Sequence, residues 1–256
     1  MTVFRPQANW AAVVVFSLPF LVWETISRLG WISPLFFPPP TQILTSTWEI
    51  FAKGEGSEHL LTTLRRLAVG SFLGGSLGLG LGLVMGYWPS VRRLLDPLVS
   101  ALHPIPKITV LPLIMVVLGI GENTKYAVVA VAAFFPMLIN TMAGVQQIHR
   151  IHFEVARNYG AGWLSVLRWV ILPGSLPMIL AGVRLALNSA LVITLAVELV
   201  AADQGLGRLI WQAWLTMRVE QLYVGIGVGA AIGILINLGL AALQRHLVPW
   251  QEADSV

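Results

Sequence analysis

The chain has 256 residues, of which 56% are hydrophobic and only 11% are charged, with a formal net charge of +4 and no cysteine. About a quarter of the residues in a soluble domain are charged, so this composition excludes an ordinary soluble enzyme. The absence of cysteine excludes disulfides and thiol chemistry. Several apolar runs approach the roughly 20 residues that a bilayer crossing needs, so we predict an all-α, multi-pass membrane protein.

The apolar runs predict about six membrane-spanning helices, and an even number places both termini on one side. Lys and Arg favour the cytoplasmic side. The basic residues divide almost evenly between the two sides, but the Arg92-Arg93 turn and the basic middle loop support cytoplasmic termini. The six predicted ranges are 9–29, 60–87, 94–119, 124–147, 175–200 and 221–246.

Residues 1–59 are predicted to form the first membrane helix and an outer loop. Three prolines, at positions 38–40, block helix formation there. After them, Leu44, Trp48 and Phe51 recur at helical spacing. This spacing predicts a short amphipathic helix, which either lies at the outer membrane interface or packs on the bundle.

Glycine recurs at every fourth position in the second predicted span and again in the last one. Such a ladder lets a neighbouring backbone approach closely, within one subunit or between subunits. The glycines are Gly70, Gly74, Gly78, Gly82 and Gly86, and then Gly225, Gly229 and Gly233.

The third predicted span is rich in proline, with Pro97, Pro104, Pro106 and Pro112. It should be kinked or begin irregularly. Broken backbone at membrane depth is tolerated mainly where protein or a water cavity covers it. Pro106 and its neighbour Lys107 are therefore candidate pathway residues, and a kink that only shapes the bundle is the alternative.

Three polar residues in the fifth predicted span are further pathway or gate candidates. Glu198 lies near its outer end, where a charged group should face a cavity or a partner. It either holds the gate region in an ion pair, with Arg208 as the candidate, or helps to receive an external binding protein. Arg184 lies about 20 Å away along the same helix, too far to pair with Glu198. Arg184 and Asn188 either line a path or make interhelical bonds.

Between the fourth and fifth spans, residues 149–174 are polar enough to leave the membrane. Gly160 and Gly162 interrupt them, which predicts two short helices joined by a glycine turn. A compact protrusion of this kind is a docking surface for a soluble partner; an ordinary connector is the alternative. The predicted docking residues are Glu154, Val155, Ala156, Arg157, Tyr159, Gly160, Trp163, Leu172 and Pro173.

The sequence carries no nucleotide-binding G-x-x-x-x-G-K-[ST] loop and no H-E-x-x-H metal pair. The His residues form no cluster with metal-ligand spacing. We therefore predict a chain that is not an enzyme, holds no metal or cofactor and binds no nucleic acid. If transport is driven by ATP, another polypeptide must supply the ATPase.

The 149–174 segment resembles the signature of ABC importer permeases, which reads Glu-Ala-Ala, three residues, Gly, nine residues, Ile, any residue, Leu-Pro. Here it stands as Glu154-Val155-Ala156, Gly160, Val170 and Leu172-Pro173. The resemblance covers roughly residues 35–248. Three further stretches are similar to permeases for nitrate, sulfonate, taurine and bicarbonate: PKITVLPLIMVVLGIG from Pro106, ILPGSLPMILAGVRLAL from Ile171 and ELVAADQGLGRLI from Glu198.

The resemblance implies a type I ABC importer permease fold, in which residues 149–174 form cytoplasmic coupling helices within a core of residues 60–248. It also implies a second permease copy, two cytoplasmic ATPase subunits that bind ATP and Mg²⁺, and a periplasmic or lipoprotein solute-binding protein. The chain would lie in a bacterial inner membrane, with a cytoplasmic tail at 249–256. By alternating access it would import a small anion or organic acid.

Two other functions remain open at this point. An ion-coupled secondary transporter would need a charged relay or an internal repeat of spans, and neither is clear in the sequence. A membrane scaffold would explain the docking loop but not the proline-broken third span.

Overall fold

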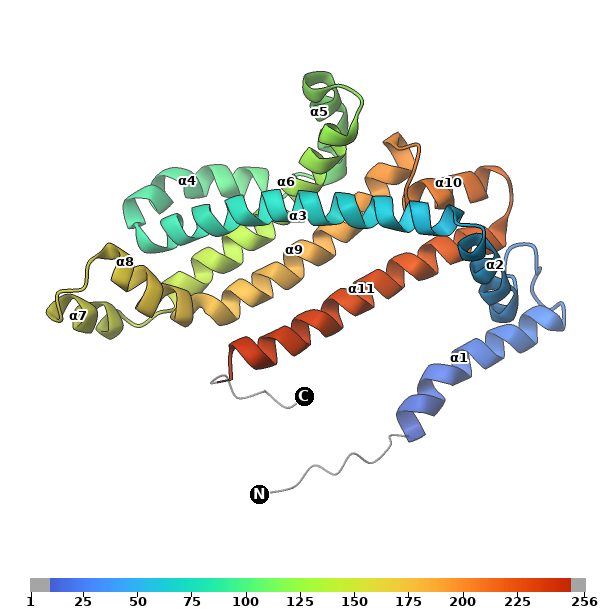
Figure 1. The fold of residues 1–256 in the computed structure, drawn as a ribbon, viewed down its shortest axis with the longest axis horizontal. Coiled ribbons are helices and arrows are strands. Elements are labelled where there is room, and N and C mark those ends of the chain that lie inside the picture. The colour runs from blue at the N-terminus through green and yellow to red at the C-terminus, as the bar shows by residue number, and fades with distance from the viewer. Residues whose placement is uncertain (1–9, 250–256) are drawn as a thin grey trace.

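The computed structural model describes residues 10–249, and within that range every regular element is helical (Figure 1). A 3₁₀ turn at Lys107–Val110 precedes α5, and a π-helical turn at Leu167–Ile171 joins α8 to α9. The α-helices are α1 (Trp10–Arg28), α2 (Pro40–Ala52), α3 (Glu55–Tyr87), α4 (Pro89–Leu102), α5 (Leu111–Leu118), α6 (Glu122–Gln146), α7 (Arg150–Asn158), α8 (Trp163–Val166), α9 (Leu172–Ala201), α10 (Leu206–Leu215) and α11 (Val219–Leu247).

Four helical stretches in the described residues are long and apolar enough to cross a membrane. They are α3, α6, the continuous stretch Trp163–Ala201 and α11. The bent pair of α4 and α5 makes a fifth if it counts as one span. The predicted span at 9–29 coincides with α1, except that residue 9 lies outside the described range. A total of six crossings stays a prediction, as does the 249–256 tail, of which only residue 249 is described.

The α3–α6 pair forms the centre of the fold, and the glycine ladder of α3 explains how closely the two helices approach. A Cβ atom at Gly74 would overlap the carbonyl oxygen of Ala130 in α6. A Cβ at Gly82 would lie 2.7 Å from the carbonyl oxygen of Leu138. The ladder therefore packs against a helix of the same subunit, which is the first of its two predicted roles.

Helix α9 packs against both α6 and α3, and the three helices enclose the main apolar core. Val129 and Ala133 of α6 meet Ala190 and Leu191 of α9 within it. The second glycine ladder, on α11, is less crowded. Only Gly225 is closely covered, because its Cβ would lie 2.5 Å from Ile210 in α10.

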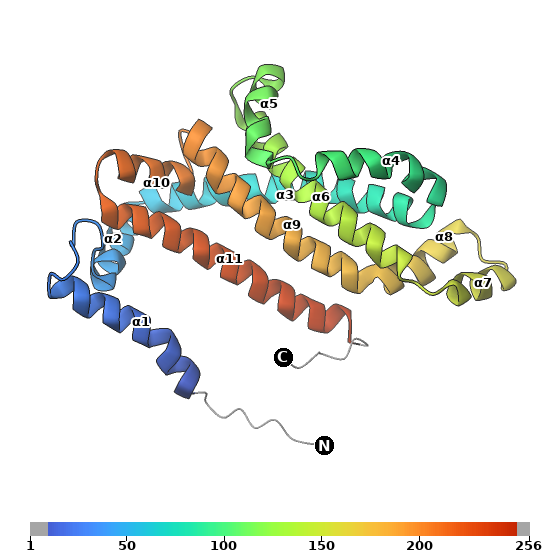
Figure 2. The ribbon, with the colours of Figure 1, turned by 180° about the vertical axis from the view of Figure 1, so that it is seen from behind.

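The proline-rich third span is not one straight helix. The chain breaks after Leu102, and α4 and the stretch Lys107–Leu118 meet at 92°. Pro104 and Pro106 lie inside the break, and proline offers no backbone N–H to continue a helix. As a result α5 stands out from the body, as both views show (Figures 1 and 2). The predicted range 94–119 was wrong as a single helix, and the predicted irregularity is confirmed.

The amphipathic helix predicted after the three prolines is α2, which packs against α3 and α11. Ile50 is its buried contact, whereas Leu44 and Trp48 remain exposed. The predicted helix is confirmed, and it packs on the bundle through Ile50 and through Phe51 of the predicted stripe, because a Cβ atom at Gly56 of α3 would lie 3.0 Å from each of these side chains.

Candidate functional site

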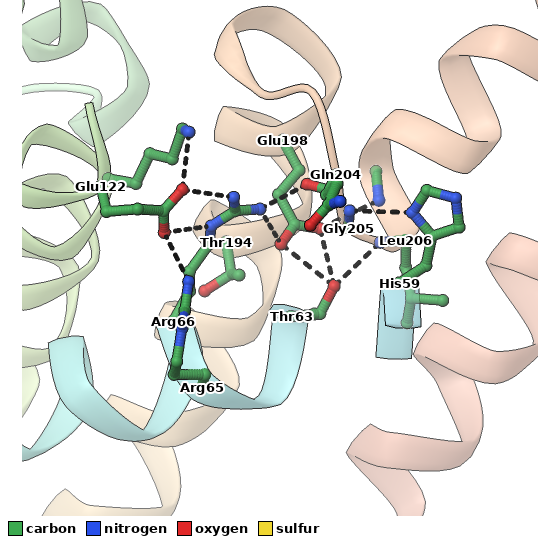
Figure 3. Close-up of polar contacts among 12 residues, drawn as sticks. His59, Thr63, Arg65, Arg66, Glu122, Thr194, Glu198, Gln204, Gly205 and Leu206 are labelled. Atoms are coloured by element: carbon green, nitrogen blue, oxygen red, sulfur yellow. Dashed lines mark hydrogen bonds and ion pairs between the residues drawn. The ribbon is translucent and has the colours of Figure 1, made fainter. Parts of the chain in front are cut away.

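A largely buried polar cluster joins α3, α6 and α9 (Figure 3), at the end of the molecule where α10 lies (Figure 1). We call Thr63, Arg66, Glu122 and Glu198 the Glu198 cluster. Glu198 has no exposed surface. Its Oε1 accepts a hydrogen bond from Arg66 Nη1 at 2.9 Å, and its Oε2 accepts one from Thr63 Oγ1 at 2.8 Å. Both carboxylate oxygens are thus held by side chains of α3.

Arg66 bridges the two carboxylates of the cluster. Its side chain is only 3% exposed, and it also donates from Nη2 to Glu122 Oε1 at 2.6 Å and from Nε to Glu122 Oε2 at 2.9 Å. This two-pronged contact is the strong geometry for an arginine–carboxylate pair. Lys125 Nζ lies 2.8 Å from Glu122 Oε1. Arg66 therefore ties α3 to α6 and α9 at once.

The cluster also fixes the chain that follows α9. The backbone N–H of Gly207 donates to Glu198 Oε2 at 3.0 Å, and that of Leu206 donates to Thr63 Oγ1 at 2.8 Å. Gly205 donates to His59 Nδ1 at 3.0 Å. These groups are the free N–H donors at the start of α10, which an anion satisfies well. The cluster thus caps α10 and holds it against α3.

Gly205 and Gly207 permit this close approach. Gly205 has φ +120°, and a Cβ atom there would overlap the carboxyl carbon of Glu198. A Cβ at Gly207 would lie 2.6 Å from Glu198 Cβ. Protein donors reach both oxygens of the Glu198 carboxylate in this structure. We call this arrangement the latch, and its role at a gate stays a prediction.

Arg208 was the predicted partner of Glu198, and this was wrong. Arg66 occupies that place, and Arg208 Nε is buried without a hydrogen-bond partner. Proximity along the chain favoured Arg208, but the turn at Gly205 and the start of α10 separate it from the carboxylate. Sequence reasoning did not assign Thr63, Arg66 or Glu122. The signal that could have found Arg66 was an arginine inside an apolar span at the same depth as Glu198.

The 149–174 segment lies at the opposite end of the molecule, where α7 and α8 project from the bundle in both views (Figures 1 and 2). Helix α7 ends in a Schellman turn: Ala161 N–H donates to the Ala156 carbonyl oxygen and Gly160 N–H to that of Arg157, both at 2.9 Å. Gly160 has φ +72°, the left-handed conformation that this turn requires. The predicted glycine turn between two short helices is confirmed.

The predicted docking residues lie on this projecting turn and on the helices beside it. Tyr159 is 88% exposed, and Glu154, Val155 and Arg157 are exposed with it. Ala156 and Pro173 are half-buried and line a hollow of about 780 Å³ between α7 and the start of α9. The exposed predicted residues at the turn and after it are Gly160, Trp163 and Leu172.

An aromatic cluster packs the 149–174 segment against the helical bundle. Trp163 lies 4.7 Å from Tyr87 and 4.6 Å from Trp88, measured between ring centroids. Phe153 of α7 lies 5.9 Å from Tyr87. These distances fit the favourable range for aromatic pairs. Trp163 therefore fixes the segment to the end of α3 as well as contributing exposed surface.

The second short helix of the segment continues into a membrane helix. Helix α8 passes through the π-helical turn Leu167–Ile171 directly into α9. A π turn inside a helix frequently marks a functional position. Since Glu198 lies near the far end of α9, one continuous helical stretch joins the 149–174 segment to the Glu198 cluster.

The remaining pathway candidates fall into two groups. Arg184 Nη2 donates to Gln244 Oε1 at 3.2 Å, and Asn188 exchanges hydrogen bonds with Asn237. Both residues therefore tie α9 to α11, and their place on the pathway stays a prediction. Pro106 and Lys107 lie apart from them, at the break between α4 and α5. Within residues 10–249, no group of three His, Asp or Glu side chains could hold a metal.

The sequence profile of one family, described as the binding-protein-dependent transport system inner membrane component, matches residues 74–252. The chain belongs to this family. It is thus an inner-membrane, multi-pass permease component of an ABC importer, and the recognition made from residues 154–173 is confirmed.

Several curated proteins with similar sequences are named as transport permeases. The chain is 38% identical over 234 residues to the taurine transport system permease protein TauC of Escherichia coli, covering 90% of this chain and 85% of the relative. It is 35% identical over 232 residues to the putative aliphatic sulfonates transport permease protein SsuC of the same species, covering 91% and 88%. It is 27% identical to the bicarbonate transport system permease protein CmpB of a Synechocystis strain, covering 90% and 86%.

The fold has a solved counterpart. The permease resembles a chain of the MetNI methionine ABC transporter in an inward-facing conformation, with a TM-score of 0.66 and 20% sequence identity. The match covers 74% of this chain and 94% of the other. At this identity the likeness concerns the fold alone.

Proposed function

We propose that this permease forms half of the pathway of an ATP-driven importer that carries a small organic or inorganic anion into the cytoplasm by alternating access. In this proposal the 149–174 segment faces the cytoplasm, together with both termini, and binds a separate ATPase subunit that holds ATP and Mg²⁺. Two ATPase subunits and an external solute-binding protein complete the importer.

The observation that carries this proposal is the continuous helical stretch from α8 to the Glu198 cluster. The exposed turn connects to α9 through α8 and the π-helical turn, and Glu198 of the latch lies near the far end of α9, which is about 45 Å long at 1.5 Å per residue. A partner that moves the turn therefore moves a helix of the latch. Such two-ended elements are what a two-state transport cycle needs.

The substrate class comes from the relatives. Their names specify taurine, aliphatic sulfonates and bicarbonate. These solutes share an anionic group, so we assign a small anion to this permease. The external binding protein would select among such solutes before the permease meets them.

A second copy of this chain is the proposed partner within the membrane. Helix α5 projects from the body, and Leu113, Val116 and Val117 on it are exposed together with Ile120 just beyond it. A short helix that is apolar on this scale needs cover from lipid or protein. A second permease would cover it and complete the pathway.

The docking role is tested by charge reversal at Glu154. We expect Glu154→Arg to weaken co-purification of the ATPase subunit and to reduce uptake in proteoliposomes, with membrane insertion unchanged. The matched control is Glu49→Arg, which reverses an exposed charge on α2 at the other end of the molecule. Equal ATPase recovery with the two variants would refute docking at this surface.

The energy source is tested with the same proteoliposomes. We expect uptake only with the ATPase subunits, the binding protein and ATP present. Uptake by this chain alone under a sodium or proton gradient would favour the secondary transporter instead. Stable association with the ATPase but no uptake under any condition would favour the scaffold.

A further inference from the structure

A cavity of about 600 Å³ lies between α3, α6 and the broken α4–α5 pair. Its wall is almost entirely apolar and includes Leu77, Leu113 and Phe134. It is separate from the Glu198 cluster and from the hollow beside α7, because it shares no lining residue with either. Its volume suits a small organic molecule.

Lys107 is the one charged residue in the wall of this cavity. Its Nζ donates to the carbonyl oxygen of His103 and lies 5.1 Å from the centre of the Phe135 ring. No carboxylate among the described residues lies within 4 Å of this ammonium group. An ammonium group has three donors, and the structure gives this one a single hydrogen bond, so it can bind an incoming acceptor.

Lys107 lies where the proline-rich span is broken, and it also lines the cavity. The residue begins the 3₁₀ turn that follows Pro106, where α4 has ended and α5 has not begun. Non-helical backbone and a charge are both costly inside a membrane, and both are tolerated where they line a cavity. Here the break and the charge border the same cavity.

We propose that this cavity is an anion-binding station of the pathway, in which Lys107 holds the anionic group and the apolar wall holds the rest of the solute. The proposal rests on the proposed import of a small anion and adds where the anion is held. It also sets a preference. No acidic side chain lines the cavity, so a second, positively charged group on the solute finds no partner there. An alkanesulfonate should therefore bind better than a zwitterionic aminosulfonate.

The natural absence of cysteine makes a direct test possible. Thr109 is exposed and lines the cavity, so Thr109→Cys introduces a single thiol beside Lys107. The full chain, in nanodiscs of zwitterionic lipid, would be treated with 2-sulfonatoethyl methanethiosulfonate, an anion, and with its trimethylammonioethyl counterpart, a cation. The measured quantity is the ratio of the two modification rates.

With Lys107 in place we expect the anionic reagent to be favoured, and Lys107→Met should lower the rate ratio by roughly tenfold. Lys107→Arg should keep the ratio high. The matched control thiol is Leu44→Cys on α2, exposed and remote from the cavity, where Lys107→Met should leave the ratio unchanged. An unchanged ratio at position 109, or a thiol there that the anionic reagent cannot reach while position 44 reacts, would overturn the proposal.

Competition then tests the preference. Sodium hexane-1-sulfonate should slow modification of the Thr109→Cys thiol, and taurine at the same concentration should slow it less. Lys107→Met should abolish the protection. Equal protection by the two solutes, or protection that survives Lys107→Met, would contradict the station. None of these readouts involves ATP, so a failure of ATP-driven uptake and a failure of the anion station are separate results.

Discussion

The two ends of the permease differ in how their charged side chains are placed. At the Glu198 end, the buried Glu198 and the partly exposed Glu122 share the buried Arg66 as their cation, and Glu198 also holds α10. At the α7 end, an ordered turn leaves charged and aromatic side chains exposed. At the first end, the charged groups find their partners within this chain. At the second end, the backbone is ordered but the side chains remain exposed. This difference agrees with the proposed roles, an internal latch at one end and a docking surface for the ATPase at the other.

The largest effect should follow from removing the cation of the latch. Arg66→Met leaves Glu198 buried without its ion-pair partner, so we expect a loss of about 3–5 kcal/mol in the free energy of unfolding. Thermal unfolding of the purified protein in detergent measures it. Arg65→Met is the neighbouring control: that side chain is 57% exposed and lies 3.5 Å from Glu122, so its loss should cost less than about 1 kcal/mol. Similar melting temperatures for the two variants would show that the latch is unimportant for stability.

Alanine substitutions at two glycines with positive φ, one at each end, allow the stability of the two ends to be compared directly. Gly205→Ala combines strained backbone with overlap against Glu198, so we expect a loss of roughly 3 kcal/mol. A Cβ atom at Gly160 would have no neighbour within 4 Å. Gly160→Ala should therefore lower the free energy of unfolding by about 1 kcal/mol, from backbone strain alone. The same unfolding measurement decides the order. A greater loss at position 160 would mean that the exposed turn is the more constrained end.

Neutralising the latch carboxylate should separate transport from docking. Glu198→Gln keeps the shape but weakens charge-assisted bonds, at a cost of roughly 1–3 kcal/mol. We expect uptake to fall while ATPase co-purification stays normal, because the change lies at the far end of α9. An unchanged uptake rate would remove Glu198 from the functional residues.

The smallest effect on stability should come from the exposed turn. Tyr159→Ser removes a ring that is 88% exposed, so the free energy of unfolding should change by less than about 0.5 kcal/mol. ATPase co-purification should nevertheless decline, because the ring would lie in the docking contact. Normal recovery of the ATPase with this variant would shift the docking surface away from Tyr159.

Local patterns predicted much of this architecture. Apolar runs located the long helices to within a few residues, and the glycine spacing of α3 predicted its close packing. Gly160 predicted the turn after α7 because left-handed backbone has a strong residue preference. The family signature in the same segment identified the permease. Each of these signals depends on neighbours along the chain.

The parts that sequence reasoning missed depend on distant partners. Arg66 and Glu198 are 132 positions apart and meet only because α3 and α9 pack side by side. The 92° bend after α4 was predicted as a kink of unknown size, since prolines specify where a helix stops and not where the chain goes next. Helix α10 was not predicted, because its place depends on the cap that the latch supplies.

The contact between Gly74 and Ala130 limits how this protein can move. Along the row of glycines the two backbones touch without intervening side chains, so separating α3 from α6 would lose close packing at several positions at once. We therefore expect α3 and α6 to move together as one unit. In the proposed transport cycle the other helices would then change position relative to this pair.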